Sequence, residues 1–403
     1  MLTVEIKTAA ERARLRRFAL GAQGLLQREP FGRGLSGARK AIAHLGYVQI
    51  DTISVVERAH HHVFRSRVPN FTPEMTNTLL KDRSIFEYWA HAAAFLPMHD
   101  FRFSLPYKHM YAAGQTHWVR SRDKKLMAEL KHRIAAEGPL RSRDVEQARG
   151  KSGGWWDWKP AKKALEQLFM EGELMVTARE GFEKTYDLTE NVLPGDVDTR
   201  HPSHADFAAY LIDQQLQCHG LVTLKGLTYL RRDAALRNAV KQAVQTRLAD
   251  GQLQALRLPT GEMFYATAGL WDRAAPRAPR ALRILSPFDN AVIQRDRLQS
   301  LFDYDYQIEC YVPEAKREFG YFCLPILYQD HFIGRVDCKA HRAERRLELK
   351  ALHFCEHPFP DDELVDALSV TLPDFAAFQG CDEIDVTQVS PARLHKPLRQ
   401  AIK

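Results

Sequence analysis

Paired cysteines and metal-ligand motifs are missing from this sequence of 403 residues. Its six cysteines stand singly, and none forms the C-x-x-C pair of a zinc ribbon or a thioredoxin-like motif. His341, His353, Cys355 and His357 lie near one another, but no second ligand pair follows at metal spacing. We therefore expect small buried thiols and surface imidazoles there, with no metal ion, no cofactor and a reducing compartment.

Long hydrophobic runs are missing as well. No stretch approaches the ~20 apolar residues of a membrane helix, and the start, MLTVEIKTAAERARLRRFAL, lacks the apolar core of a signal peptide. We expect a cytoplasmic protein that does not bind membranes. The sequence also lacks a Gly-rich phosphate loop and an acidic cluster for two metal ions, which disfavours a nucleotide-dependent enzyme and a two-metal nuclease.

Basic residues are in moderate excess. Lys and Arg number 57 and Asp and Glu number 50, which gives a net charge of +7 and a pI of about 9.0. Hydrophobic residues make up 45% and charged residues 27%, which is typical of soluble globular proteins. The length suggests about two to four domains. The charge fits a polyanionic partner, but it is not diagnostic, because many basic proteins do not bind nucleic acid.

Segment 121–197 gives the clearest indication of fold. Periodicity predicts an amphipathic helix at Lys124–Glu137, which ends at Gly138-Pro139. A short helix in RSRDVEQARG and a helix at Ala161–Glu171 follow, and then two strands, ELMVTARE and EKTYDLT. Three helices and a hairpin in this order are typical of a winged helix, a DNA-binding variant of helix-turn-helix.

Segment 198–272 repeats that order. It predicts a helix at His204–His219, a short element, a helix at Ala234–Gly251 and a hairpin. We therefore expect another winged helix there, and a degenerate first copy in 1–120 whose third helix would be Ala38–Leu45. In 1–120 the sequence also predicts a helix within 8–28 that opens with a Thr8–Glu11 capping box, and a short helix at Glu74–Lys81.

The C-terminal third is rich in β-branched and aromatic runs. After a Pro/Arg-rich linker at 273–283, the runs YQIECYV, GYFCLPILYQ, HFIGRVDCKAH and LELKALHFCE predict strands of a small β-barrel. The barrel and a final helix at Glu363–Phe378 would fill 282–380, and we expect the polar tail 381–403 to be loose. The whole chain therefore reads as an α+β protein, with tandem winged helices followed by a small β-barrel.

Gln49 and Asp51 are the most informative pair of polar residues. They lie two positions apart in the apolar run YVQIDTISVV, so in an extended segment both side chains point to the same side. A carboxylate in such a run needs partners, or a function that compensates its desolvation. The alternative is that Asp51 is an ordinary helix N-cap. Periodicity alone favours this alternative, because capping carboxylates far outnumber catalytic ones.

A second cluster lies in FEYWAHAAAFLP, which contains Glu87, Trp89 and His91. A carboxylate, an aromatic residue with a polar tip and an imidazole in one short stretch could line a binding cleft. An aromatic core strand explains Trp89 equally well, because buried Trp and Tyr tips usually find partners. Glu87 and His91 are the better candidates for a cleft.

Several basic side chains are candidates for DNA phosphate contacts, which set affinity but carry little sequence information. They are Arg67, Lys159, Lys162, Lys163, Arg335 and Lys339. The three lysines start the third helix of segment 121–197, where a recognition helix would meet phosphate. His60-His61-His62 looks like a metal-binding tract, but three adjacent residues cannot all face one ion. We interpret it as DNA-facing or incidental.

Five blocks occur in order over nearly the whole chain: YVQIDTI, FEYWAHAAAFLP, GWWDWKPAKKALEQLFMEGELMV, SPFDN and FIGRVDCKAHR. Together they resemble the winged-helix DNA glycosylases that unhook interstrand crosslinks (YcaQ-like and AlkZ-like), particularly the YcaQ-like branch. The resemblance implies a C-shaped body around DNA. It also implies a catalytic motif of glutamine, apolar residue and glutamine or aspartate, here Gln49-Ile50-Asp51. The three histidines are not part of that pattern.

The resemblance implies a monofunctional glycosylase of base excision repair that acts on N7-alkylated purines and unhooks interstrand crosslinks. Its partner would be double-stranded DNA with alkylated or crosslinked guanine, bound by a monomer associated with the nucleoid. Asp51 would stabilise the cationic sugar and accept the water proton, and Gln49 would orient that water. The alternative is a winged-helix transcription regulator without catalytic activity, which would gain nothing from a negative charge at Asp51 aimed at DNA.

Overall fold

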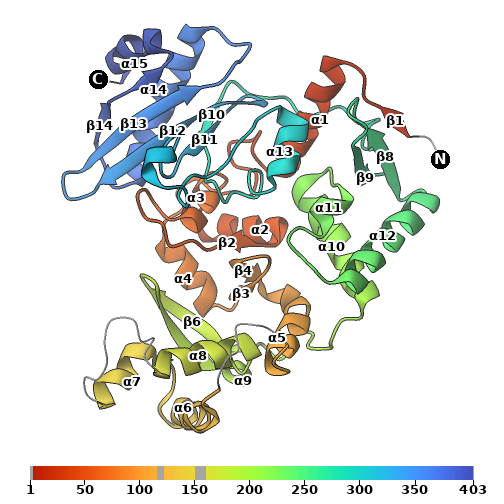
Figure 1. Cartoon of the computed structure of the whole chain (residues 1–403), viewed down its shortest axis with the longest axis vertical. Helices are drawn as coiled ribbons and strands as arrows, with labels where there is room; N and C mark the ends of the chain where they lie inside the picture. Colours follow the sequence, from red (N-terminus) through yellow and green to blue (C-terminus); the bar gives the residue numbers. More distant parts are fainter. Residues whose placement is uncertain (1–2, 116–121, 150–159, 403) are drawn as a thin grey trace.

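The structure, a computed structural model, describes residues 3–115, 122–149 and 160–402. The chain forms an elongated mixed α+β body (Figure 1), with a six-stranded sheet and its helices at one end and segment 122–197 at the other. None of the helices within the described ranges is long and apolar enough to cross a bilayer.

Three segments share one order of elements, and we call them repeat 1 (residues 34–97), repeat 2 (124–188) and repeat 3 (204–267). Repeat 1 comprises α2 (Gly34–Leu45), β2 (Val48–Gln49), α3 (Ala59–Arg65), α4 (Glu74–Lys81), β3 (Ile85–Trp89) and β4 (Ala93–Pro97). Repeat 2 comprises α6 (Lys124–Glu137), β5 (Leu140–Arg141), α7 (Ser142–Arg149), α8 (Pro160–Glu171), β6 (Leu174–Glu180) and β7 (Glu183–Leu188). Repeat 3 comprises α10 (His204–His219), α11 (Leu224–Leu227), α12 (Ala234–Ala249), β8 (Leu253–Arg257) and β9 (Met263–Thr267).

The sheet topology of the repeats is also shared. In repeats 1 and 2 the short strand after the first helix pairs antiparallel with the second strand of the hairpin, in the orders β2-β4-β3 and β5-β7-β6. In repeat 3 this pairing shrinks to a single antiparallel bridge between Val222 and Tyr265 of β9. Each repeat is therefore a helix, a short strand or bridge, two helices and a hairpin.

The prediction that Ala38–Leu45 is the third helix of the first copy is wrong, although these residues do form a helix. These residues lie in α2, the first helix of repeat 1, and the third helix is α4. The cause is Gly46, which ends α2 in the left-handed region at φ 75° and turns the chain directly into β2. Any side chain at this position would also clash with the amide of Gln214 on α10.

The N-terminal segment packs outside repeat 1. It comprises β1 (Val4–Glu5) and α1 (Ala9–Ala22), which opens with the predicted capping box between Thr8 and Glu11. β1 pairs parallel with β8 of repeat 3. Leu15 and Leu20 of α1 share a hydrophobic core with Leu256 and Leu298. The N-terminal segment therefore packs against residues that lie more than 200 positions later in the chain.

The C-terminal sheet is open in its strand order and not a closed barrel. Five strands run β10-β11-β12-β13-β14, and β15 pairs beside β14 on β13. Their bounds are β10 (Leu282–Ile284), β11 (Leu324–Tyr328), β12 (His331–His341), β13 (Arg346–Phe354), β14 (Glu383–Val386) and β15 (Val389–Ser390). The helices around it are α13 (Arg295–Phe302), α14 (Asp361–Phe378) and α15 (His395–Ala401).

Two predictions for this region are wrong. The run YQIECYV forms no strand; it lies in segment 303–323, whose only regular element is the 3-10 turn η2 (Glu314–Lys316). The tail is ordered, because its apolar residues Val386, Val389, Leu394 and Leu398 pack into the core of the sheet. The turn η3 (Ala392–Leu394) connects β15 to α15.

Three shorter elements link the repeats. They are η1 (Met98–Ser104), α5 (Leu105–Ala112) and α9 (Thr189–Val192), together with the residues up to Ser203, which N-caps α10. α5 packs against α8 of repeat 2. Repeats 1 and 2 are thus joined by the packing of α5 as well as by the covalent linker.

Candidate active site

Gln49 is the last residue of β2, the short strand of repeat 1. It pairs with Ala94 of β4, and the N–H of Ile50 donates to the carbonyl of Ala93 at 2.8 Å. The chain then leaves the sheet, and residues 50–58 precede α3. In repeat 2, by contrast, β5 runs directly into α7, and in repeat 3 Thr223 N-caps α11. Repeat 1 alone has a loop at this place, and that loop contains Asp51.

The loop 50–58 is held by the C-terminal sheet and by repeat 2. The carbonyl of Val55 accepts a hydrogen bond from the N–H of Ala340 in β12 at 2.8 Å. At its far end, the guanidinium of Arg58 lies 3.9 Å above the ring of Phe182 and donates to the carbonyl of Gly181 at 2.8 Å. The loop is therefore fixed by two other parts of the fold.

Asp51 is half-buried, and its Oδ1 accepts a hydrogen bond from the N–H of Ile53 at 2.8 Å. This is a local Asx-type turn, since no helix begins before Ala59. Burial raises the pKa of the Asp51 carboxyl, and the backbone N–H groups of Ile53 and Thr52 oppose that rise. A carboxylate with a raised pKa is a better proton acceptor than an ordinary surface aspartate.

His91 fixes the orientation of the Gln49 amide. Its Nε2 lies 3.0 Å from Gln49 Oε1, and its ring packs edge-on against Tyr47 and Tyr229, with centroids 5.0 and 5.2 Å away. Burial lowers the pKa of His91 to about 4, so the ring is neutral near pH 7. Because an amide oxygen can only accept, this contact requires Nε2–H to donate to Oε1, and the amide NH₂ of Gln49 can then donate to another group.

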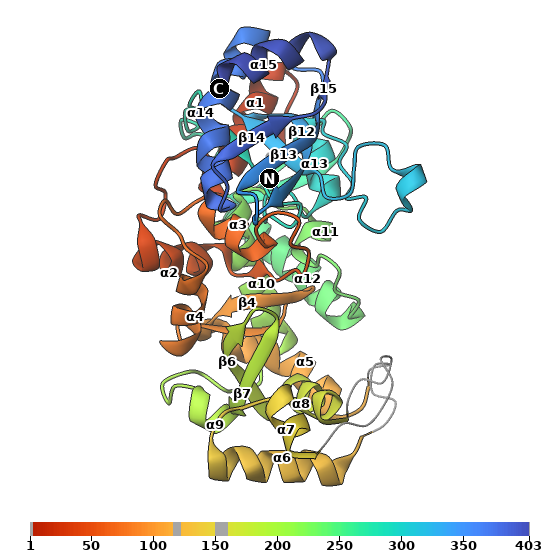
Figure 2. The same cartoon turned by 90° about the vertical axis from the view of Figure 1, so that its left-hand side faces the viewer.

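Segment 303–323 carries an exposed aromatic residue beside Asp51. Tyr311 is 81% exposed, and the negative charge of Asp51 contributes, after burial and Cys310, to raising the pKa of its hydroxyl. The segment stands out from the sheet (Figure 2), where its colour is light blue. Glu309 secures it by accepting hydrogen bonds from the N–H groups of Phe319 and Gly320 at 2.8 and 3.0 Å. Sequence reasoning missed Tyr311 because its run resembled a strand.

Arg335 does not face solvent as we expected of a phosphate contact. It lies buried on β12, with its guanidinium 4.0 Å from the ring of Phe319, and it donates to the carbonyl of Asp305. Both partners belong to segment 303–323. From its buried position on β12, Arg335 therefore holds the segment that carries Tyr311. Lys339, four residues along the same strand, is exposed and remains a candidate phosphate contact.

Arg67 is also not a DNA contact, because its side chain is 0% exposed. It forms a two-pronged ion pair with Asp289 of the SPFDN block, at 2.7 and 2.8 Å, and donates to the carbonyl of Gln23 at 2.8 Å. Asn290 of the same block donates to the carbonyl of Tyr47 at 3.1 Å, just before β2. SPFDN therefore anchors repeat 1 to the rest of the protein.

Glu87 is buried and does not line a cleft. Its carboxylate forms ion pairs with Arg179 of β6, at 2.6 and 2.7 Å, and with Lys184 of β7 at 3.3 Å. Burial alone would raise the pKa of Glu87, but the two cations outweigh it and lower the pKa. Glu87 thus ties repeat 1 to the hairpin of repeat 2. Trp89, at the end of the same strand, is 38% exposed.

The remaining sequence candidates divide by exposure. Lys162 and Lys163 are exposed on α8, while Lys159 and the tryptophans of GWWDW lie outside the described residues. His60, His61 and His62 are all buried in α3, so the DNA-facing interpretation of this tract is wrong. His61 binds Glu57 at 2.8 Å, and His62 binds the carbonyl of Ile284 at 2.8 Å. Within the described ranges, no group of three His, Cys, Asp or Glu side chains could hold a metal ion.

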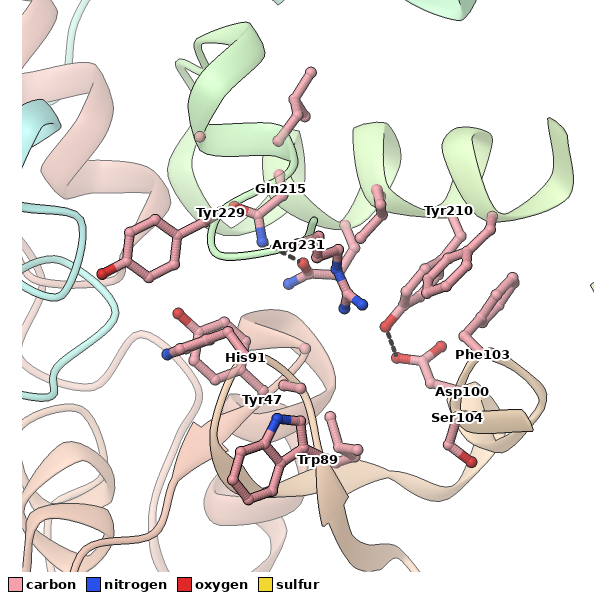
Figure 3. Close-up of a pocket in the computed structure, with 18 of the residues that line it drawn as sticks. Tyr47, Trp89, His91, Asp100, Phe103, Ser104, Tyr210, Gln215, Tyr229 and Arg231 are labelled. Carbon is pink, nitrogen blue, oxygen red and sulfur yellow. Dashed lines mark hydrogen bonds between the residues drawn. The ribbon is translucent and has the colours of Figure 1, made fainter. Parts of the chain in front are cut away.

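A cleft lies between repeats 1 and 3 (Figure 3). Trp89, His91 and Tyr47 line it from repeat 1, and Tyr229 and Arg231 line it from repeat 3. His91 is shared, because its ring faces the cleft while its Nε2 holds Gln49. The sequence did not single out Tyr229 or Arg231, since they follow α11 in a short irregular stretch without a motif.

The fold is that of a known DNA glycosylase. Among solved structures, the chain is similar to the DNA glycosylase AlkZ of Streptomyces sahachiroi, with a TM-score of 0.61 and 15% sequence identity. The match covers 94% of this chain and 99% of that one, and at this identity it shows the fold alone.

The family follows from sequence as well. The model of the family described as DNA glycosylase AlkZ-like matches residues 42–378, which include β2, the loop 50–58 and the strands β10 to β13 of the C-terminal sheet. The chain therefore belongs to the AlkZ-like DNA glycosylases, which are enzymes of DNA repair. This membership disfavours the alternative of a transcription regulator without catalytic activity.

Proposed function

We propose that this glycosylase hydrolyses the N-glycosidic bond of N7-alkylated purines in duplex DNA, including guanines tied into interstrand crosslinks. One observation carries the proposal: a half-buried carboxylate, Asp51, follows an oriented amide, Gln49, on the loop that only repeat 1 possesses. This pair is the aspartate form of the motif that the sequence resemblance implies. The placement in the YcaQ-like branch rests on the same residues and stays a prediction.

The proposed chemistry places its demand on the sugar. An N7-alkylguanine is a cation, so it leaves as a neutral base and needs little acid assistance. An oxocarbenium-like charge develops at the anomeric carbon, and the Asp51 carboxylate stabilises it. The amide NH₂ of Gln49, with Oε1 held by His91, donates to the attacking water, whose proton passes to Asp51. No amine nucleophile takes part, so the product is an intact abasic strand.

A shallow site suits a crosslinked substrate. A crosslinked base cannot be fully flipped, because its partner strand holds it, so a deep base pocket would hinder binding. The half-buried position of Asp51 and the exposed ring of Tyr311 beside it fit a site that meets the lesion within the duplex.

We further propose that the three repeats are winged helices arranged as a C-shaped body around DNA, bound as a monomer. Their shared order and topology, with a short strand paired to the hairpin, support that assignment. In this arrangement α4, α8 and α12 are the recognition-type helices, and Lys162 and Lys163 on α8 face phosphate.

Alanine at Lys162 and Lys163 is expected to weaken DNA binding equally for all sequences. The slope of log affinity against log salt should fall by about one for each phosphate that is no longer neutralised. Binding of a labelled duplex, measured at several salt concentrations, checks this. Lys396→Ala on α15, also exposed, is the matched control and should keep the slope. An unchanged slope in the double variant would move the DNA surface away from α8.

Excision is expected to proceed fully in excess EDTA without added nucleotide. Water and a carboxylate suffice for the proposed step, so chelation should not change the rate. The test uses a duplex with one 7-methylguanine and compares strand breakage with and without alkali. Intact abasic DNA until alkali treatment is the predicted result. Breakage without alkali would reveal a lyase, and activity lost to EDTA and restored by a divalent ion would reveal a metal step.

His91→Phe is expected to lower the excision rate about tenfold at saturating DNA, the worth of one hydrogen bond that orients Gln49. The phenyl ring keeps the packing against Tyr47 and Tyr229 but cannot donate to Oε1. His91→Gln offers an amide donor and should recover part of the rate. A merely structural role for His91 would instead lower the unfolding temperature of both variants and leave their rates alike.

A further inference from the structure

We propose that the cleft between repeats 1 and 3 binds one backbone phosphate of the lesion strand, and that Arg231 is the group that holds it. The inference rests on the proposed function only in using Gln49 and Asp51 to mark where the damaged nucleotide reacts. The ligand is a phosphodiester of DNA, and the site belongs to repeat 3, which carries none of the proposed catalytic residues.

Arg231 lies in the cleft without an anionic partner (Figure 3). Within the described part of the chain, no carboxylate lies within the 4.0 Å of an ion pair from its guanidinium, and the guanidinium carbon lies 5.0 Å from the centroid of the Phe207 ring. The side chain is half-buried, and burial lowers its pKa. An enclosed guanidinium without a counter-charge is costly, so an anionic ligand would stabilise it.

The other groups that line the cleft do not neutralise the charge of Arg231. Asp100 is the acidic residue that lines the cleft, and its carboxylate accepts a hydrogen bond from the hydroxyl of Tyr210 at 3.1 Å and lies 3.5 Å from His99. Burial raises the pKa of Asp100, and His99 and the hydroxyl of Tyr210 oppose that rise. His91 is neutral near pH 7 because burial lowers its pKa to about 4. Arg231 is thus the cation of the cleft that faces no anionic partner among the described residues.

A phosphate fits this arginine better than other anions do. The planar guanidinium donates in pairs, a geometry that matches phosphate oxygens. The substrate is DNA, which presents a phosphate on each side of every nucleotide. His91 lines the cleft and also holds Gln49, so a phosphate bound by Arg231 belongs to a nucleotide next to the reacting sugar. Trp89, 38% exposed at the same cleft, offers an apolar surface to the adjoining sugar.

Binding of this phosphate would position the lesion strand. A phosphate held in the cleft would fix the strand relative to Asp51, and such orientation lowers the barrier without touching the reacting atoms. A base that is tied to the other strand cannot be positioned by a base pocket, so positioning through the backbone is the remaining route. Arg231 is therefore a substrate-binding residue, and it should act on affinity and placement together.

The test is a phosphate-interference series on a duplex with a tetrahydrofuran abasic analogue, which binds without chemistry. Single methylphosphonate linkages, which are uncharged, are placed one at a time at the three linkages on each side of the analogue. For the wild-type protein, a methylphosphonate at one particular linkage is expected to weaken binding about tenfold more than a methylphosphonate at any of the other linkages. Arg231→Gln is expected to bind the all-phosphate duplex about tenfold more weakly and to lose nothing further at that linkage. Arg231→Lys, which keeps a point charge, should fall between them.

Arg232→Gln is the matched control, because it removes the same charge from the next residue, which is exposed. It should keep the wild-type interference pattern, linkage by linkage. An Arg231→Gln variant that still folds, by its melting curve, and shows the wild-type pattern would overturn the inference. So would equal weakening at every linkage. Because the duplex is inert, coupling between Arg231 and one phosphate can be present even if 7-methylguanine excision fails, so the two proposals are separable.

Discussion

Asp51→Asn is expected to lower 7-methylguanine excision by roughly two to four orders of magnitude, the usual worth of a catalytic base. Asparagine keeps the size of the side chain and the oxygen that accepts from Ile53 N–H, so the loop 50–58 should keep its fold. It removes the charge that stabilises the sugar cation. Single-turnover excision, with DNA affinity and unfolding temperature measured beside it, checks the prediction.

The controls for this variant are chosen to separate charge from structure. Gln49→Ala should be milder, because orienting the water is only part of the barrier. Asp196→Asn, on an exposed residue of the segment after α9, should leave excision unchanged. An Asp51→Asn enzyme that excises near the wild-type rate would remove Asp51 from the mechanism.

The pH profile gives the same residue a second signature. The ionised carboxylate is the active form, so excision is present above the pKa of Asp51 and is lost as the pH falls through it. Burial raises that pKa above its ordinary value of 3.8, so the acid limb should lie at a higher pH than for a surface aspartate. The limb should be missing from the residual activity of Asp51→Asn. No inflection near pH 6.5 is expected from His91, because its pKa is lowered to about 4.

Arg67→Met is expected to lower the free energy of unfolding by about 3–5 kcal/mol, because it leaves the buried carboxylate of Asp289 without its partner. Both side chains are 0% exposed, so water cannot replace the missing ion pair. Denaturant unfolding of the variant beside the wild type measures the effect.

The double variant Arg67→Met with Asp289→Leu separates the ion pair from general packing. Removing both charges avoids an unpaired buried ion, so the double variant should be more stable than Arg67→Met alone. Additive losses, or a loss below about 1 kcal/mol for Arg67→Met, would mean that the network around SPFDN does not anchor repeat 1.

The helices could be predicted where the local signals are complete. The bounds of α4, α6 and α10 agree with the sequence prediction, since each combines 3.6-residue periodicity with a clear end. Segment 303–323 and the tail could not be predicted in the same way. The first has the composition of a strand but is held as a loop by Glu309. The second places its few apolar residues in a core built elsewhere.

The candidate site shows the same division. Gln49, Asp51 and His91 lie within one short sheet and loop, and the structure brings Gln49 and His91 together. Arg67 and Glu87 find their partners 222 and 92 residues away, and no local pattern reveals such pairs. An arginine or glutamate read from sequence alone therefore looks like a surface group.

The structure also shows why a helix cap was a reasonable alternative for Asp51. At the corresponding place in repeat 3, directly after the bridging residue, Thr223 is a helix N-cap, with Oγ1 accepting from the N–H of Gly226 at 3.0 Å. Repeat 1 has the same local pattern, but residues 50–58 delay the helix. The carboxylate of Asp51 therefore caps no helix and accepts a hydrogen bond from the N–H of Ile53 within the loop.

The most direct test of the central claim is the release of free base from duplexes that differ only in the charge of one purine. Wild-type enzyme is incubated with a duplex containing 7-methylguanine and with one containing unmodified guanine at the same position. The free base is then quantified by chromatography. We predict stoichiometric release of 7-methylguanine and no release of guanine, because only the cationic base leaves without acid assistance. Failure to release 7-methylguanine, or release of both bases at similar rates, would contradict the mechanism built on Gln49 and Asp51.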